Sequence, residues 1–162
     1  MNTPLSEPPL ARVSLRAVIE SDLPIFFEHQ RDPESNRMAA FPARDEAAFM
    51  AHWHKILRDE SNKTRTILYG GVVVGNIASF TVEGQREVGY WIGKEYWGKG
   101  IATGALAALL DIEPIRPLYA HVVKHNIGSR RVLEKCGFIL SGEDSMTHDD
   151  GTFVEEYLLK LD

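Results

Sequence analysis

The chain has 162 residues, of which 44% are hydrophobic and 25% charged, an ordinary balance for one globular domain with a full core. It contains 18 Lys and Arg against 23 Asp and Glu, which argues against a nucleic-acid-binding protein, since such proteins usually carry a basic excess. No apolar run approaches the roughly 20 residues of a membrane span, and no secretory leader pattern is present, so we expect a cytoplasmic protein without membrane partners.

The first part of the chain predicts a strand and a helix. Residues 1–12 include a Pro-rich stretch and are expected to form a flexible tail, and a short strand is predicted over Val13–Val18. Ser21 is expected to cap a helix that tolerates Pro24 in its first turn. The remaining residues, 13–162, are expected to form a single domain.

A second helix is predicted from Asp45, which is expected to be its N-cap. Apolar residues from Phe49 to Leu57 recur there at helical spacing. Residues 31–44, between the two helices, are polar and interrupted by prolines, so we expect a loop.

Three strands are predicted next. Residues 64–69 and 72–80 flank Gly70 and Gly71, which is a strong hairpin signal. Residues 87–92 predict the third strand.

The second half of the chain predicts alternating helices and strands. A helix is expected to begin near Gly98 and to end before Pro114, followed by a strand over residues 118–123, a helix over 126–136 and a closing strand over 153–161. This order around a mostly antiparallel meander predicts one mixed α/β sheet.

The end of the predicted 126–136 helix carries a capping signal. Gly137 is suited to the C′ position, and Phe138 is expected to pack back on Leu133 in a Schellman motif. Before the closing strand, the acid-rich residues 141–151 are expected to form a solvated hairpin loop.

A glycine-rich stretch from Gly93 to Gly104 nearly matches a P-loop, G-x-x-x-x-G-K-[ST]. Gly100 stands where that motif needs a hydroxyl for magnesium, and Asp111, the acid nearest the loop that ends an apolar run, lies in the following helix. A strand, a glycine turn and a helix start can instead hold a diphosphate on backbone amides without metal. A P-loop kinase or ATPase remains a minor alternative.

A second motif, HNIGSRRVLEKCGF over residues 125–138, follows the next predicted strand. The order strand, W-G-K-G-I-A, helix, strand, N-x-x-S-x-x-V-L-E-K-x-G-F resembles the GNAT N-acetyltransferase superfamily, and especially the branch with the ribosomal-protein-alanine N-acetyltransferases. The resemblance extends from about Val13 to Leu161. It implies a mostly antiparallel twisted sheet, splayed between two parallel strands and flanked by helices, with acetyl-coenzyme A as the cosubstrate.

The resemblance also implies which residues hold the cosubstrate. The loop amides would bind the diphosphate, the end of the splayed strand would pair with pantetheine, and Asn126 would contact the pantetheine arm, although it also suits a helix N-cap. Tyr90, Trp91 and Thr103 could equally be ordinary structural residues. The implied cosubstrate-binding residues are Tyr90, Trp91, Ile92, Trp97, Gly98, Lys99, Gly100, Ile101, Ala102, Thr103 and Asn126.

Two residues are candidates for the base that takes a proton from an attacking amine. Glu87 begins the strand implied to splay, where the family often places an acid; the alternative is a salt bridge with Arg86 or another cation. His121, on the neighbouring strand, has an unperturbed pKa of about 6.5 that suits the task; the alternative is a structural histidine.

The usual general acid of the family is missing from the sequence. Many relatives carry a tyrosine seven residues after the asparagine, and here that residue is Leu133; Ser129, three residues after Asn126, could instead donate a hydrogen bond to the leaving sulfur. Cys136 has no obvious histidine partner and is expected to be a buried apolar residue.

The expected activity is acetyl transfer to a primary amine of a small molecule or a protein N-terminus, and the acceptor itself cannot be identified. A non-catalytic acyl-coenzyme A-binding module is the main alternative. The chain has no HExxH or paired-cysteine motif, so we expect no metal, and a homodimer is compatible with the family.

Overall fold

A computed structural model describes residues 12–162, in which the strands form one seven-stranded sheet with the order β1-β2-β3-β4-β5-β7-β6. Neighbouring strands are antiparallel except β4 and β5, which are parallel. Apart from Arg12, the tail expected over residues 1–12 lies outside the described residues. The strands are β1 (Val13–Ala17), β2 (Lys63–Tyr69), β3 (Val72–Val82), β4 (Gln85–Ile92), β5 (Leu118–Val123), β6 (Ile139–Thr147) and β7 (Phe153–Leu161).

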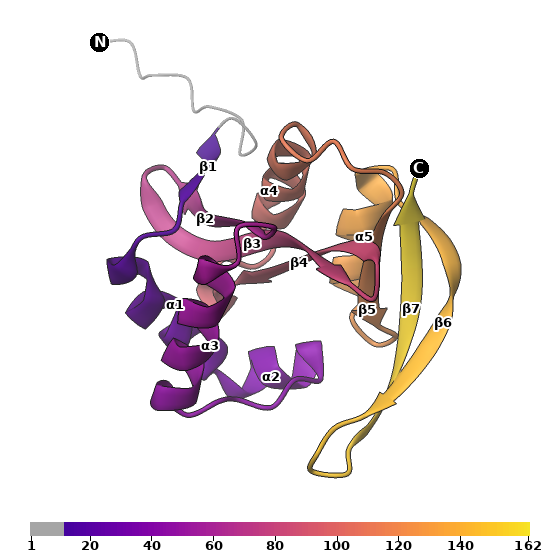
Figure 1. Ribbon diagram of the computed structural model, residues 1–162, viewed down its shortest axis with the longest axis horizontal. Helices are drawn as coiled ribbons and strands as arrows, with labels where there is room; N and C mark the ends of the chain where they lie inside the picture. Colours follow the sequence, from indigo (N-terminus) through magenta and orange to yellow (C-terminus); the bar gives the residue numbers. More distant parts are fainter. Residues whose placement is uncertain (1–11) are drawn as a thin grey trace.

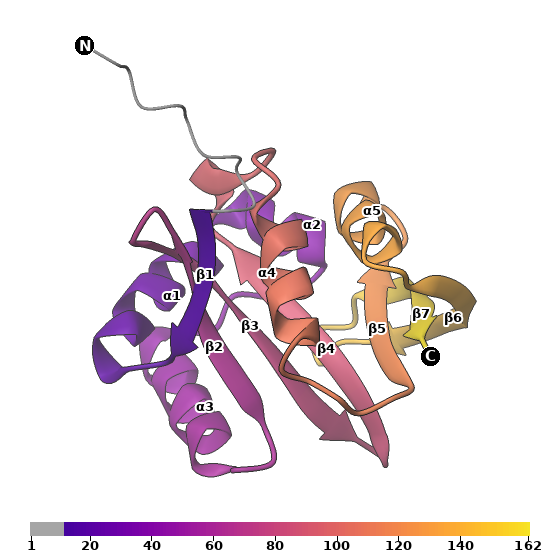
Figure 2. The ribbon, with the colours of Figure 1, turned by 90° about the horizontal axis from the view of Figure 1, so that it is seen from above.

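Two groups of helices pack against the sheet, with α1 beside α3 and α4 beside α5 (Figures 1 and 2). Within residues 12–162, no helix is both long and apolar enough to cross a lipid bilayer. The helices are α1 (Leu23–Gln30), α2 (Pro33–Ala39), α3 (Glu46–Arg58), α4 (Ile101–Leu110) and α5 (Ile127–Lys135), with 3-10 turns at Glu20–Asp22 and Lys94–Tyr96.

The core consists of two apolar clusters. The larger joins the sheet to α4 and α5 and includes Leu106 and Leu133, while the smaller joins α1 to α3 through Phe26 and Trp53. The rings of Phe26 and Trp53 lie with their centroids 5.0 Å apart. Burying such side chains is the main force that holds the helices on the sheet.

The parallel strands β4 and β5 are paired at one end only. Arg86 faces Leu118 and Glu87 faces Tyr119, and no later pair of the two strands is registered within residues 12–162. β5 pairs instead with β7 along its whole length, from Leu118 to Val123. The strands therefore diverge beyond Glu87, and the predicted fold, a mixed sheet splayed between two parallel strands, is confirmed.

A buried polar network lies at the closed end of this splay. The Arg86 Nη2 donates to Glu113 Oε2 at 3.1 Å, and Ser79 Oγ donates to the same oxygen at 2.6 Å. Glu113 is fully buried, so these partners are needed to offset its desolvation. Arg86 is thus engaged with Glu113, which corrects the alternative in which it pairs with Glu87.

Residues 31–44, expected to be a loop, contain the helix α2. Asp32 is its N-cap, with its carboxylate accepting from the Ser35 N–H at 2.8 Å, and Pro33 occupies the first turn. Ala40 ends it in the left-handed conformation, with φ of 48°. We interpreted Pro33 as a helix breaker, but a proline is tolerated at the first helical position because its missing N–H has no helical partner there.

The acid-rich residues 141–151 were expected to be a loop, and most of them belong to strand β6. β6 pairs with β7 from Ile139 opposite Lys160 to Thr147 opposite Phe153, so the turn is confined to residues 148–152. β6 is the edge strand and nearly all its residues are exposed. Without a buried face, it lacks the alternation that identifies a strand from sequence.

Ser21, expected to cap the first helix, lies in a 3-10 turn, and Asp22 precedes α1 instead. The Asp22 carboxylate is buried; it accepts from Arg16 at 2.7 Å and from Thr66 Oγ1 at 2.6 Å. Although burial opposes ionisation, the hydrogen bonds from Arg16, the Ile19 N–H and Thr66 lower the pKa of Asp22 to about 2.

The other predicted caps are confirmed. The Asp45 carboxylate accepts from the Ala48 N–H at 2.8 Å at the start of α3. At the end of α5, the Phe138 N–H donates to Leu133 O at 3.1 Å and Gly137 has φ of 96°, which is the Schellman motif.

Candidate active site

The glycine loop forms an open turn before α4. Gly98 and Gly100 both have φ of +76°, and no atom lies within 4 Å of where a Cβ on either would point. The Gly104 N–H is the first to bond inside the helix, to Gly100 O at 3.1 Å, so the amides of residues 101–103 have no helical partner. Gly100 has no side chain to cap them. The turn therefore offers free N–H groups to an anion.

Trp97, at the start of this loop, is tied to the end of β4. Its Nε1 donates to Ile92 O at 2.9 Å. The indole therefore fixes where the loop leaves the sheet, a contact that the sequence does not predict.

The loop opens into a cavity of about 700 Å³ between the diverging end of β4, the start of α4 and α5. We call this cavity the glycine groove. All predicted cosubstrate residues except Lys99 line it, together with Ser129. Those residues are Tyr90, Trp91, Ile92, Trp97, Gly98, Gly100, Ile101, Ala102, Thr103 and Asn126.

Residues of α2 also line the glycine groove, and they were not among the predicted site residues because this segment was expected to be a loop. They are Ser35, Met38 and Ala39. The Ser35 hydroxyl is buried and forms no hydrogen bond within residues 12–162. A buried unpaired hydroxyl beside a cavity is suited to a ligand polar group.

Tyr90 crosses the glycine groove from β4 to α5. Its hydroxyl lies 2.7 Å from Ser129 Oγ and 3.2 Å from Ser129 O. Burial raises the pKa of Tyr90 to about 12 despite the hydrogen bond to Ser129. The phenol therefore keeps its proton and can orient the serine hydroxyl, while Asn126 accepts from the Ser129 N–H at 3.2 Å.

The two candidate bases form one pair. His121 Nε2 lies 3.1 Å from Glu87 Oε1, and the carboxyl group is nearly buried while the imidazole is about one-third exposed. Because Tyr90 points toward α5 and strand residues alternate, Glu87 lies on the opposite face of the sheet. The pair therefore lies where β4 and β5 begin to diverge, on the face of the sheet opposite to the Tyr90 side chain.

The pair has an acidic surrounding. The hydrogen bond with Glu87 raises the pKa of His121 above its ordinary value, and the charges of Glu87, Glu156 and Asp144 add to this effect against burial. Burial also raises the pKa of Glu156. The sequence reasoning missed Glu156 and Asp144, because the pairing of β6 and β7 that brings them there was not predicted.

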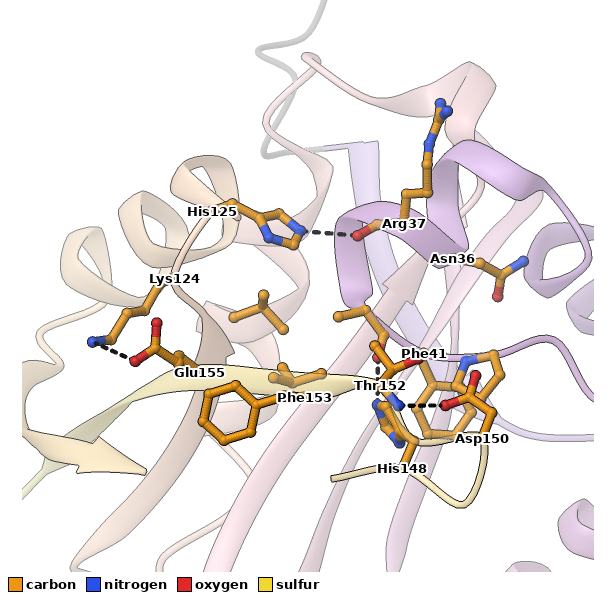
Figure 3. Close-up of a pocket in the computed structure, with 14 residues that line it drawn as sticks. Asn36, Arg37, Phe41, Lys124, His125, His148, Asp150, Thr152, Phe153 and Glu155 are labelled. Carbon is orange, nitrogen blue, oxygen red and sulfur yellow. Dashed lines mark hydrogen bonds and ion pairs between the residues drawn. The ribbon is translucent and has the colours of Figure 1, made fainter. Parts of the chain in front are cut away.

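A second cavity, of about 650 Å³, lies between the C-terminal end of α2, the end of β5 and the β6–β7 turn (Figure 3). We call it the hairpin cavity. His125 Nε2 lies 2.9 Å from Arg37 O, and His148 Nε2 lies 2.6 Å from Ala40 O. Since carbonyl oxygens accept, both imidazoles donate, and they hold α2 in place. His125 lines both cavities.

Cys136 does not join these groups. It is half-buried, its Sγ lies 3.7 Å from Thr103 O, and burial raises the pKa of its thiol. Over residues 12–162 there is no group of three or more His, Cys, Asp and Glu placed to hold a metal ion.

A family model described as the acetyltransferase (GNAT) domain matches residues 12–139. YdaF of Bacillus subtilis (strain 168), provisionally assigned as a ribosomal N-acetyltransferase, is 33% identical over 110 residues, which are 63% of this chain and 57% of YdaF. The chain thus matches little more than half the length of this relative.

Solved structures share the fold. A spermidine N-acetyltransferase from Vibrio cholerae, in complex with CoA and spermine, superposes with a TM-score of 0.80 at 17% identity, over 93% of this chain and 95% of the other. RimL, a ribosomal L7/L12 alpha-N-protein acetyltransferase in complex with coenzyme A, has a TM-score of 0.77 at 19% identity, over 95% and 96% of the two chains. At these identities the likeness concerns the fold alone.

Proposed function

The chain belongs to the GNAT acetyltransferase family, and on that basis we propose that it transfers an acetyl group from acetyl-coenzyme A to a primary amine by direct attack on the thioester. The observation that carries the proposal is the splay of β4 and β5, which has the glycine groove on one side and the Glu87–His121 pair on the other. A bound thioester and an amine could thus meet between the two strands.

The glycine groove fits a coenzyme A without metal. The free amides of residues 101–103 would hold the diphosphate at the positive end of α4, and Gly98 and Gly100 leave room for it to approach. The unpaired end of β4 would hold the pantetheine arm along its backbone, with Asn126 beside it. When bound, acetyl-coenzyme A supplies an activated acyl carbon.

The Glu87–His121 pair is suited to receive the proton of the amine. His121 Nε2–H donates to Glu87, which leaves Nδ1 to accept a proton when the imidazole is neutral. A water molecule between the amine and the pair would relay the proton to His121 in the same way.

Ser129 is suited to hold a hydrogen bond to the leaving sulfur. Its hydroxyl faces the glycine groove and is oriented by Tyr90. Leu133, at the position of the tyrosine common in relatives, is buried in the core and cannot take this role. Because a thiolate with a pKa of about 8.5 is a fair leaving group, a hydrogen bond without proton transfer is sufficient.

A second candidate is a non-catalytic acyl-coenzyme A-binding module, which the buried Leu133 favours. One experiment separates the enzyme from the binding module: the protein is incubated with acetyl-coenzyme A and a panel of amines. Release of free thiol is the readout, and mass spectrometry identifies the acetylated amine. We expect turnover with at least one amine, and loss of turnover in Glu87→Gln. Tight binding of acetyl-coenzyme A with no turnover across the panel would favour the binding module.

The cytoplasmic location, the absence of a resident metal, the absence of nucleic-acid partners and the homodimer remain predictions. Activity in excess chelator tests the metal, and light scattering during gel filtration tests the oligomer. The flexible tail over residues 1–12 and the single domain over residues 13–162 are likewise proposals, which limited proteolysis would check.

A further inference from the structure

The hairpin cavity opens onto the face of the sheet that carries the Glu87–His121 pair. Val123, which lines the cavity, follows His121 by two residues on β5, so it lies on the same face and roughly 7 Å along the strand. On β7, Val154 lines the cavity and Glu156, the partner of Val123, follows it by two residues. A molecule in the cavity can therefore extend one end to the pair.

The wall of the hairpin cavity has an apolar part contributed by three segments, with Phe41 after α2, Val123 on β5 and Phe153 on β7 (Figure 3). Phe153 is 64% exposed, so its ring is available at the mouth of the cavity. Phe41 is fixed by the edge of His148, with ring centroids 6.2 Å apart, and by Arg44, 4.9 Å from its ring centroid. The fixed ring of Phe41 suits an apolar ligand body.

The charged groups of the hairpin cavity do not suit a second ammonium group. Its cations include Arg37 and Lys124, and Lys124 lies 4.0 Å from the carboxylate of Glu155, which shares this wall. The Asp150 carboxylate accepts from the Thr152 N–H at 2.9 Å, within the turn itself. The cavity is thus lined by two cations and two carboxylates, and has no excess of negative charge to hold a second ammonium group.

Carboxylates that form no ion pair with a lysine or arginine of residues 12–162 lie instead at the other end, around the Glu87–His121 pair. Asp144 and Glu156 are opposite each other on β6 and β7, and both act on His121 together with Glu87. This end favours one ammonium group, which must lose a proton before it attacks.

Resting on the proposed function, we propose that the acceptor is a primary monoamine with an aromatic or branched apolar body, which occupies the hairpin cavity while its amine reaches the Glu87–His121 pair. The cavity of about 650 Å³ has the size of a small-molecule site. Polyamines and peptide N-termini are the competing classes.

The test compares 2-phenylethylamine, 3-methylbutylamine, spermidine and a peptide with a free alanine N-terminus as acceptors, with thiol release as the readout. We expect kcat/KM for 2-phenylethylamine to exceed that for spermidine and for the peptide at least about tenfold. Phe153→Ala should lower kcat/KM for 2-phenylethylamine by about tenfold and leave the Kd for acetyl-coenzyme A unchanged.

Ile139→Ala is the matched control, because Ile139 is 63% exposed on β6 and does not line the cavity. Ile139→Ala should leave unchanged both the kcat/KM for 2-phenylethylamine and the Kd for acetyl-coenzyme A. A higher kcat/KM for spermidine or the peptide, or an effect of Ile139→Ala equal to that of Phe153→Ala, would overturn the assignment while acetyl transfer stands. Binding of acetyl-coenzyme A with no acetylation of any amine would overturn the proposed function itself.

Discussion

The glycine groove and the hairpin cavity are built in different ways. In the groove, the groups offered to an anion are main-chain N–H groups, those before Gly104, and the end of β4 leaves further main-chain groups unpaired with β5. In the cavity it is side chains, brought together by contacts such as that between His148 and Ala40, 108 residues apart. A main-chain surface depends on a few glycines, whereas a side-chain surface can change with each substitution.

This difference has a functional consequence. A site for a constant cosubstrate can be kept by backbone geometry, while a site for a variable acceptor can be altered residue by residue without disturbing the fold. His125, which lines both cavities and bonds to α2, is where the two regions join. Substitutions confined to one region should therefore affect the binding of one substrate only.

The largest effect is expected at the Glu87–His121 pair, the proposed acceptor of the amine proton. Glu87→Gln and His121→Gln should each lower kcat by about 1000-fold, because the amine then keeps its proton. The double variant should be no worse than either single variant, since the two groups act together. Steady-state kinetics with a saturating amine measures this; additive losses would show that the residues act independently.

The same pair predicts a pH dependence. Because Glu87 raises the pKa of His121 above 6.5, His121 stays protonated to higher pH, and kcat/KM should rise as pH increases through that raised pKa. In Glu87→Gln the negative charge is lost and any remaining hydrogen bond to His121 is no longer charge-assisted, so the midpoint of the residual activity should move down toward 6.5. An unmoved midpoint would contradict the pairing.

The next largest effect tests the main-chain nature of the glycine groove. Gly100→Val places a branched side chain at φ of +76° in the turn, and should raise the Kd for acetyl-coenzyme A by about 100-fold. Gly84→Val is the matched control, because Gly84 has φ of +80° and equally open surroundings in the β3–β4 turn. Calorimetry should find its Kd unchanged; equal losses in both variants would mean that backbone strain alone is responsible.

A smaller effect tests the hairpin cavity. His148→Ala removes the hydrogen bond to Ala40 O and the support of Phe41, and should raise KM for the amine by about tenfold while the Kd for acetyl-coenzyme A stays constant. His54 lies on α3, away from both cavities, and contacts Glu20 at the surface. His54→Ala should therefore change neither the KM for the amine nor the Kd for acetyl-coenzyme A. A raised Kd for acetyl-coenzyme A in His148→Ala would show that the two regions are not separable.

The smallest effect is expected for Tyr90→Phe, which removes the phenol that orients Ser129. Losing one hydrogen bond of ordinary strength should lower kcat by about fivefold and leave both binding constants unchanged. Pre-steady-state measurement of thiol release isolates this step. A change in the Kd for acetyl-coenzyme A without a change in kcat would assign Tyr90 to binding alone.

The parts of the fold that were predicted correctly rest on local patterns. The glycine turn, the Asp45 and Asn126 caps and the Schellman motif at Gly137 each involve residues only a few positions apart, so the chain itself specifies them. Glu87 and His121 were candidates from the family resemblance, but their contact depends on the parallel pairing of β4 and β5.

The parts that were missed depend on distant partners. α2 is short and polar, and it is held by histidines from the β5–α5 turn and the β6–β7 turn. β6 is an exposed edge strand that pairs, within residues 12–162, with β7 alone, so its sequence shows no buried face. The hairpin cavity consists largely of these segments, and for that reason the sequence indicated the cosubstrate but not the acceptor.

The most direct test of the account is calorimetric titration of the protein with acetyl-coenzyme A in excess chelator, followed by ATP. We expect saturable binding of acetyl-coenzyme A without divalent metal, because the glycine groove is proposed to hold a diphosphate on main-chain amides, and no binding of ATP. Failure to bind acetyl-coenzyme A at millimolar concentration, or binding of ATP that requires magnesium, would contradict it.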